Sequence, residues 1–155
     1  MKSLKILSTL LAVTPGVVFA SSFSLAVFKS PTCGCCEKWI ESFDGDITIE
    51  AHNTEQMAMV KQKAGIPQQA ASCHTAVSRS NFIYEGHVPT AMVKAYENGK
   101  RSENGRGLVV PGMPVGSEGM EMGNRFEPYV VYEMLTDGSL RTYENVTSQA
   151  AQQNY

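Results

Sequence analysis

The chain has 155 residues, of which 43% are hydrophobic, 18% charged and 8% aromatic. This composition is that of one ordinary globular domain, and it excludes a disordered chain, a collagen and a coiled coil. The formal net charge of −2 gives no reason to expect a nucleic-acid-binding surface. The four cysteines are too few for a disulfide scaffold, which contains roughly 8–10% cysteine.

Residues 1–20 have the pattern of a secretory signal peptide. A basic start is followed by an apolar run over residues 6–13 and by the small residue Ala20, after which we expect cleavage. Pro15 interrupts the apolar run, which is shorter than the roughly 20 residues that a membrane-spanning helix needs. We therefore expect an exported protein without stable membrane insertion, located in the periplasm where the cell has an outer membrane.

Residues 21–147 are expected to form one domain, whose first half alternates strands and helices. The apolar spacing predicts a strand, a helix, a second strand and a second helix at residues 22–29, 36–43, 47–51 and 53–65. Asn53 and Gln56 resemble a capping box that would start the second helix.

The second half is predicted to contain two short strands, one helix and a C-terminal hairpin. These elements are expected at residues 75–79, 81–85, 89–96, 129–135 and 140–143. Residues 100–124 are rich in glycine and methionine and are expected to form a long loop with one short apolar stretch. A loop of this length is usually functional or disordered, and its three methionines argue against a simple linker. Residues 148–155 are expected to be a frayed polar tail.

The order of these elements, with cysteines at the first strand-to-helix junction, predicts an α/β fold of the thioredoxin-like type. Such a fold has a mixed central sheet with flanking helices. In it, the loop before the third strand lies against the start of the first helix. We therefore expect Cys73, which precedes the predicted strand at residues 75–79, to lie beside the earlier cysteines.

Cys33, Cys35 and Cys36 occur together in the sequence CGCC. Cys33 and Cys36 have the spacing of a redox dithiol, whose thiolate is stabilised at a helix N-terminus. Cys35 adds a third thiol directed to nearly the same point, which suits a soft metal better than simple disulfide exchange. With Cys73, four thiolates would suit tetrahedral zinc, an iron–sulfur cluster or copper(I), and two ordinary disulfides are the alternative.

Methionines of the glycine-rich loop favour copper among these metals. Met113, Met120 and Met122 lie outside any helical periodicity, and the soft thioether suits copper(I) better than zinc. Anchoring of the loop onto an apolar surface is the alternative role of these side chains.

Three histidines are candidate ligands, and we rank them in the order His87, His74, His52. His87 lies at a predicted strand end beside a tight turn. Because adjacent residues of a strand point to opposite faces, we expect Cys73 and His74 not to bind the same metal. His52 is interpreted as a solvated strand end.

Four segments resemble the family of the periplasmic copper-resistance protein CopG. They are FKSPTCGCCEKW, SCHTAV, EGHVP and VPGMPVGSEGM, and they span residues 28–120. The resemblance implies a thioredoxin-like fold that binds several copper ions, as copper(I), with bridging thiolates. It implies a role in copper tolerance and copper(I)/copper(II) redox chemistry. The thiolate ligands that it implies are Cys33, Cys35, Cys36 and Cys73. The outer ligands that it implies are His87, Met113 and Met120.

The function expected from the sequence is therefore that of a periplasmic copper-binding protein for copper tolerance. Copper ions are the expected partners, together with other periplasmic copper-handling proteins. Interconversion of copper(I) and copper(II) would make the protein a copper oxidoreductase. The alternatives are a thiol-disulfide oxidoreductase with Cys33 and Cys36 as its reactive pair, and a copper chaperone.

Overall fold

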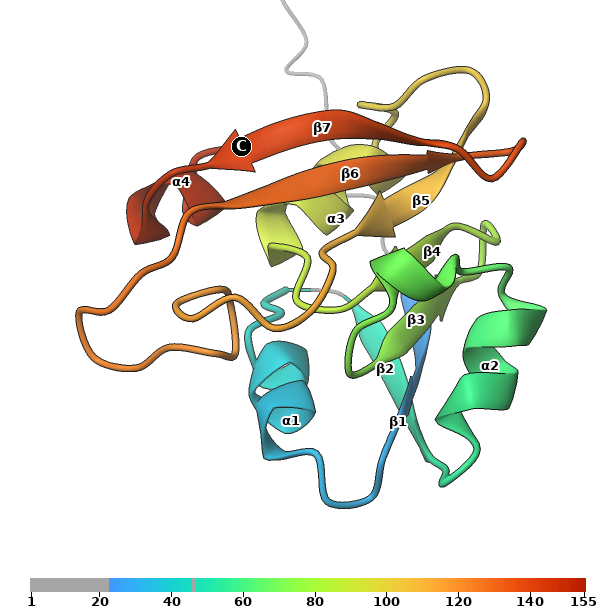
Figure 1. Cartoon of the computed structure of the whole chain (residues 1–155), viewed down its shortest axis with the longest axis horizontal. Helices are drawn as coiled ribbons and strands as arrows, with labels where there is room; N and C mark the ends of the chain where they lie inside the picture. Colours follow the sequence, from blue (N-terminus) through green and yellow to red (C-terminus); the bar gives the residue numbers. More distant parts are fainter. Residues whose placement is uncertain (1–22, 46) are drawn as a thin grey trace, which may run out of the picture.

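A computed structural model describes residues 23–45 and 47–155, so the expected signal peptide lies outside the described residues. Within them, seven strands form one mixed sheet in the order β2-β1-β3-β4-β5-β6-β7 (Figure 1). The strands are β1 Ser24–Lys29, β2 Thr48–Asn53, β3 Thr75–Ser78, β4 Ile83–Glu85, β5 Gly105–Val109, β6 Tyr129–Leu135 and β7 Leu140–Val146. Pairs β1–β2 and β4–β5 are parallel, and the other pairs are antiparallel.

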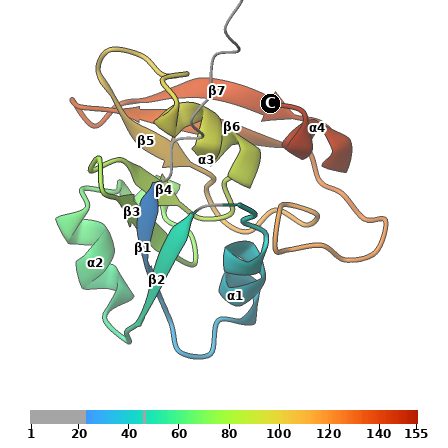
Figure 2. The ribbon, with the colours of Figure 1, turned by 180° about the vertical axis from the view of Figure 1, so that it is seen from behind.

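Helices cover both faces of the sheet (Figures 1 and 2). They are α1 Gly34–Glu41, α2 Met57–Lys63, the short 3-10 helix η1 Gln68–Ala70, α3 Thr90–Glu97 and α4 Gln149–Gln153. The larger core contains Trp39 of α1 and Tyr96 of α3, with α4 packed at its edge. A smaller core lies between the other face and the segment around η1, where Ala70 packs near Ile83 and Val109. None of the helices in the described part of the chain is long and apolar enough to span a membrane.

The α/β class and the mixed sheet are confirmed, and the thioredoxin-like assignment stays a prediction.

The predicted loop over residues 100–124 is wrong at its start, because β5 pairs there with β4 and β6. A side chain at Gly107 would collide with the backbone of Ile83. Glycine weakens a strand prediction from sequence. Here the missing side chain at Gly107 permits the close approach of β5 to β4. The loop after β5 is called here the glycine–methionine loop (residues 110–128).

The capping-box prediction for α2 is also wrong. Asn53 is the last residue of β2, and α2 begins after Gln56, which has no side-chain cap. The hydroxyl of Thr54 instead accepts a hydrogen bond of 3.0 Å from the backbone N–H of Gln56. This serine/threonine-type turn directs the chain into α2 in place of the capping box.

The polar C-terminal segment is ordered as α4 and is not frayed. The hydroxyl of Ser148 accepts a hydrogen bond from Ala151 and caps the helix. The buried side chain of Gln152 accepts a hydrogen bond from the Tyr129 hydroxyl at 2.8 Å and donates one to the carbonyl of Gly116 at 3.0 Å. These long-range hydrogen bonds hold a segment whose composition alone predicts fraying.

One end of the sheet gathers four loops. Phe28 of β1 pairs with Thr75 of β3, Thr75 pairs with Glu85 of β4, and Glu85 pairs with Val109 of β5. Because β1, β4 and β5 end at this edge while the antiparallel β3 begins there, the loops next to them emerge together. These loops are residues 30–33, 72–74, 86–89 and 110–128. The register of the sheet thus brings distant segments of the chain to one place.

Candidate metal centre

The CGCC segment forms the start of α1, with Cys33 as its N-cap residue. Cys36 is buried, and Cys33 and Cys35 are half-buried. Cys33 and Cys36 form a disulfide, with their Cα atoms 5.3 Å apart. The Sγ of Cys35 lies 3.6 Å from the Sγ of Cys33, so the third thiol lies beside the disulfide.

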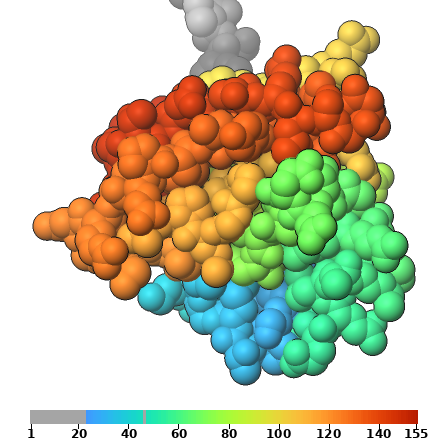
Figure 3. Space-filling view, viewed as in Figure 1, coloured from blue at the N-terminus to red at the C-terminus, as the bar shows by residue number. Residues whose placement is uncertain are grey.

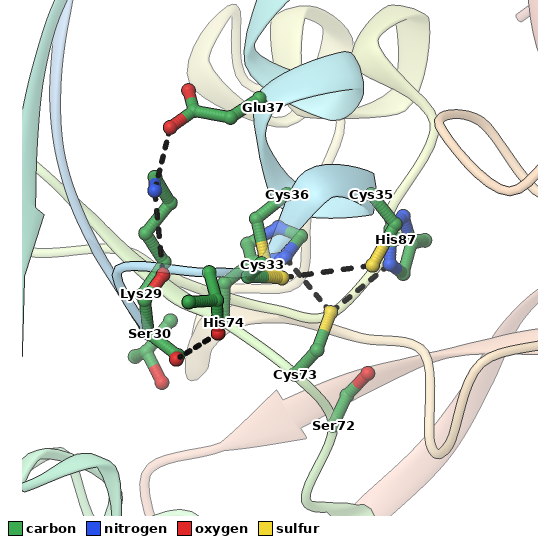
Figure 4. The surroundings of a disulfide bond; sticks show 12 residues. Lys29, Ser30, Cys33, Cys35, Cys36, Glu37, Ser72, Cys73, His74 and His87 are labelled. Carbon is green, nitrogen blue, oxygen red and sulfur yellow. Dashed lines mark hydrogen bonds and ion pairs between the residues drawn. A yellow bond between two sulfur atoms is a disulfide. The ribbon is translucent and has the colours of Figure 1, made fainter. Parts of the chain in front are cut away.

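Cys73 completes a group of four cysteines (Figure 4). The four sulfur atoms all lie within 4.8 Å of one another. Cys35 and Cys73 are free, so the alternative of two disulfides is not the arrangement found. The structure brings together the four cysteines that the sequence predicts to meet, and their role as metal ligands stays a prediction.

A buried carboxylate holds the loop that carries Cys73. The Oε1 atom of Glu85 accepts hydrogen bonds of 2.6 Å from the backbone N–H of Ser72 and from Lys61 Nζ. Its Oε2 atom accepts one of 2.7 Å from the Thr75 hydroxyl. Glu85 therefore fixes the backbone before Cys73 and a side chain after it. Sequence analysis missed this residue, although a charged side chain at the end of the apolar strand β4 is a signal for such a role.

His87 directs one ring nitrogen toward Cys73. Its Nε2 lies 3.0 Å from the Cys73 Sγ, and its Nδ1 lies 2.8 Å from the backbone carbonyl of Glu118. Donation from Nδ1–H to that carbonyl leaves the Nε2 lone pair facing Cys73, which is the arrangement typical of metal-binding histidines. Burial lowers the pKa of His87, although the Glu118 carbonyl and Glu121 act in the opposite direction.

His74 also faces Cys73, contrary to the expectation from strand alternation. Its Nδ1 lies 3.2 Å from the Cys73 Sγ. The alternation does not apply because both residues precede β3, which begins at Thr75. The ring is fully buried between Trp39 and His87, and its Nε2 has no hydrogen-bond partner among the described residues. Burial lowers the pKa of His74 well below its ordinary value, and the charges of His87 and Lys61 act in the same direction.

His52 lies elsewhere, on β2. Its ring stacks on Phe28 with centroids 5.0 Å apart, and its Nε2 lies 3.5 Å from a carboxylate oxygen of Glu50. Its side chain is 39% exposed, in agreement with the interpretation of a solvated strand end.

The Cys73 thiol is protonated at neutral pH. Burial raises its pKa to about 12, and the neighbouring Cys35 acts in the same direction, while a hydrogen bond from Ser72 and the charge of Lys61 oppose the shift. A metal that binds this sulfur must therefore displace a proton.

The glycine–methionine loop packs on α1 (Figure 3). A Cβ atom at Gly119 would lie 2.8 Å from Trp39 N and 2.9 Å from the Cys35 carbonyl oxygen. The carboxylate of Glu118 accepts hydrogen bonds from the backbone N–H and the hydroxyl of Thr90 at the start of α3. Glu118, which sequence analysis also missed, thus ties the loop to α3 and supplies the carbonyl that orients His87.

The loop methionines differ in their surroundings. Met120, next to Gly119, is half-buried, whereas Met113 and Met122 are 53% and 52% exposed. The structure therefore brings the segment of Met120 to the cysteines and leaves Met113 on the surface. Copper ligation by Met113 or Met120 stays a prediction.

Comparison with known proteins gives a consistent result. Residues 70–120 match a family described as "Protein of unknown function, DUF411", and no curated protein matches the chain significantly. A solved structure named "Copper resistance protein copG- Form 2" is 32% identical with a TM-score of 0.75, and the match covers 82% of this chain and 100% of that chain. "Copper resistance protein copG- Form 1" is 35% identical with a TM-score of 0.70, covering 79% and 95%, respectively.

The family match includes Cys73 and His87, and the structural matches extend over most of the described domain. The agreement in fold and the identity of about a third of the aligned residues exceed what a shared α/β architecture alone produces. The chain therefore belongs to the family of the copper resistance protein CopG.

Proposed function

We propose that this chain is a periplasmic copper-binding protein that contributes to copper tolerance by holding copper(I) in a multinuclear cluster bridged by cysteine thiolates. The observation that carries the proposal is the approach of four cysteine sulfur atoms to within 4.8 Å of one another. The names of the two similar structures, both copper resistance proteins, support the choice of metal. The Cys33–Cys36 disulfide must be reduced for all four thiolates to act.

The donor set favours copper(I) over harder ions. Thiolates and thioethers are soft donors that select copper(I). Bridging thiolates let each copper(I) reach two or three sulfur atoms, and four thiolates balance the charge of four copper(I) ions. A neutral His87 imidazole, with Met113 and Met120 as thioether donors, can cap the cluster without adding charge.

Copper(I) titration of the reduced protein under argon tests this proposal. We expect several copper(I) ions per chain and a lower number in Cys35→Ser, because Cys35 lies beside Cys33 and is expected to bridge. Wild-type protein with the Cys33–Cys36 disulfide is the matched control, since it has the same fold but two thiols fewer. An unchanged stoichiometry in Cys35→Ser would show that the thiolates do not share a cluster.

We further propose that the site interconverts copper(I) and copper(II). In air, four copper(I) ions would give four electrons to one dioxygen molecule, which takes up four protons to form two water molecules. Catalytic amounts of the protein should then oxidise excess copper(I) faster than the Cys73→Ser variant does. Equal rates would contradict the redox proposal and would leave copper(I) binding unaffected.

A thiol-disulfide oxidoreductase is the second candidate, and the Cys33–Cys36 disulfide at the start of α1 favours it. Cys33, which is half-buried, would be the nucleophile, and the buried Cys36 would resolve the mixed disulfide. Protein purified metal-free from copper-supplemented cells that efficiently reduces a small-molecule disulfide would support this candidate over copper binding. A chaperone would need exposed ligands, whereas none of the four cysteines is exposed: Cys36 is fully buried and the other three are half-buried.

A further inference from the structure

We propose that Cys73, His74 and His87 form a second, overlapping copper site that binds copper(II) when Cys33 and Cys36 are joined in their disulfide. This inference rests on the proposed function, because it takes copper as the ion that the protein handles. It adds a ligand, His74, to the site formed by the four thiolates, and it names the donors that would hold copper(II).

The three donor atoms already converge. The Cys73 Sγ lies 3.2 Å from His74 Nδ1 and 3.0 Å from His87 Nε2, and all three atoms lie within 4.8 Å of one another. The two rings are nearly perpendicular, at 85° with centroids 5.1 Å apart, so their nitrogens approach Cys73 from different directions. With metal–nitrogen and metal–sulfur bonds of about 2.0 and 2.3 Å, a trigonal site needs sulfur–nitrogen distances of roughly 3.7 Å. The donors must therefore separate by only about 0.5–0.7 Å.

The remaining ring nitrogen of His87 fits the same role, whereas that of His74 has no partner among the described residues. His87 donates Nδ1–H to the carbonyl of Glu118, which leaves Nε2 free to bind a metal. His74 is fully buried, and its Nε2 has no partner among the described residues. A buried polar atom without a partner is unfavourable for stability. Ligation through Nδ1 would leave the Nε2–H of His74 without an acceptor among the described residues, so it is the approach of Nδ1 to within 3.2 Å of the Cys73 Sγ that makes His74 a candidate ligand.

The disulfide changes which donors are available. With Cys33 and Cys36 oxidised, two of the four soft thiolates are withdrawn, and Cys35 and Cys73 remain free. Two imidazole nitrogens and one thiolate are the trigonal donor set of blue-copper sites, which bind copper(II) as well as copper(I). Cys73 belongs to both sets, so copper can stay at one place while the ligands around it change with the oxidation state of the Cys33–Cys36 pair.

The test uses the Cys35→Ser variant in its disulfide form, in which Cys73 is the remaining thiol. Copper(II) sulfate alone is added under argon, and visible absorption and pulsed electron paramagnetic resonance are recorded. We expect one copper(II) per chain, an intense thiolate-to-copper(II) charge-transfer band, and nitrogen couplings from two histidines.

The deciding variant is His74→Phe in the same background, with His52→Phe as the matched control. His74→Phe should remove one histidine coupling and weaken copper(II) binding by more than roughly tenfold, since loss of an outer-shell partner alone costs about 10–100-fold. His52→Phe should change neither quantity. His74→Gln provides the same test without an added aromatic ring if the phenylalanine variant does not fold.

Two results would overturn the inference. One is the lack of a charge-transfer band in folded disulfide protein, and the other is a two-histidine signature that persists in His74→Phe or His74→Gln. The copper(I) titration of reduced wild-type protein tests the proposed function separately. If the reduced protein binds several copper(I) ions but the oxidised protein shows no histidine signature, the inference is overturned and the proposed function stands. A single copper(I) together with the two-histidine signature would contradict only the multinuclear cluster.

Discussion

The Nε2 atom of His87 lies 3.0 Å from the Sγ atom of Cys73, although the two residues are 14 positions apart in the chain. Strands β3 and β4 are antiparallel neighbours, with Thr75 opposite Glu85. The residues just before β3 and just after β4 therefore meet at the same end of the hairpin. One short hairpin builds half of the candidate metal centre, and the start of α1 supplies the other half.

The Lys61–Glu85 ion pair is predicted to stabilise the protein and to position Cys73. The Glu85 side chain is fully buried, and Lys61 is 14% exposed. Lys61→Met should lower the free energy of unfolding in urea by about 3–5 kcal/mol, because it leaves a buried carboxylate without its partner. The double variant Lys61→Met/Glu85→Gln should be more stable than Lys61→Met alone, because it removes that uncompensated charge.

Asp44→Asn is the control for that prediction, because it breaks the exposed Lys94–Asp44 pair. It should change the urea midpoint little. A Lys61→Met variant with a urea midpoint as little altered as that of Asp44→Asn would contradict the structural role of Glu85.

Contact of the glycine–methionine loop with α1 is predicted to require glycine at position 119. Gly119 has a φ of +84°, and a Cβ atom there would press on the backbone of Trp39 and Cys35. Gly119→Ala should therefore destabilise the protein by more than the about 1–2 kcal/mol that left-handed backbone costs a non-glycine residue. It should also weaken copper binding, because the adjacent Glu118 carbonyl orients His87.

Gly123→Ala is the matched variant, since Gly123 also has a positive φ, of +63°, and a Cβ atom there meets nothing within 4 Å. This variant should lose only the stability that a left-handed backbone costs a non-glycine residue, and it should leave copper binding intact. Equal losses of stability and copper affinity in the two alanine variants would show that the contact with α1 is unimportant.

Met120 is predicted to act as an outer copper(I) ligand. Met120→Leu should keep the volume of the side chain while removing the thioether, and so reduce copper(I) affinity in competition with a chelator without a large change in stability. Met59→Leu, an exposed methionine on α2, is the control and should bind copper(I) as the wild type does. Identical affinities in the two variants would assign Met120 to packing.

Copper(I) binding is predicted to strengthen as the pH rises. Burial raises the pKa of the Cys73 thiol to about 12, so the metal-free protein carries this proton at neutral pH, whereas the copper-bound sulfur does not. Displacement of this one proton makes the affinity about tenfold lower for each pH unit of acidification. Chelator competition at pH 6, 7 and 8 measures the slope, and a pH-independent affinity would exclude Cys73 as a ligand.

Much of the site could be predicted because it depends on local pattern and topology. The spacing of Trp39, Ile40 and Phe43 predicts the helix that follows the CGCC segment, and the order of elements predicts that Cys73 reaches it. The supporting hydrogen bonds could not be predicted in this way. Glu85 binds Ser72 across 13 positions, and Glu118 binds Thr90 across 28, and neither pairing has a periodicity or motif that selects the partner.

The two errors have different physical origins. His74 faces Cys73 because the chain has not yet entered β3, and strand geometry applies only within the strand. The C-terminal segment forms α4 because Gln152 finds partners in Tyr129 and Gly116. Long-range hydrogen bonds override local propensity in the C-terminal segment.

The central claim is that four cysteines of one chain share several copper(I) ions. The most direct test is X-ray absorption spectroscopy of the reduced wild-type protein, saturated with copper(I) under argon and combined with metal and protein quantification. The account predicts more than one copper(I) per chain, sulfur-dominated coordination and scattering between neighbouring copper ions. Saturation at one copper per chain, without copper–copper scattering, would contradict it.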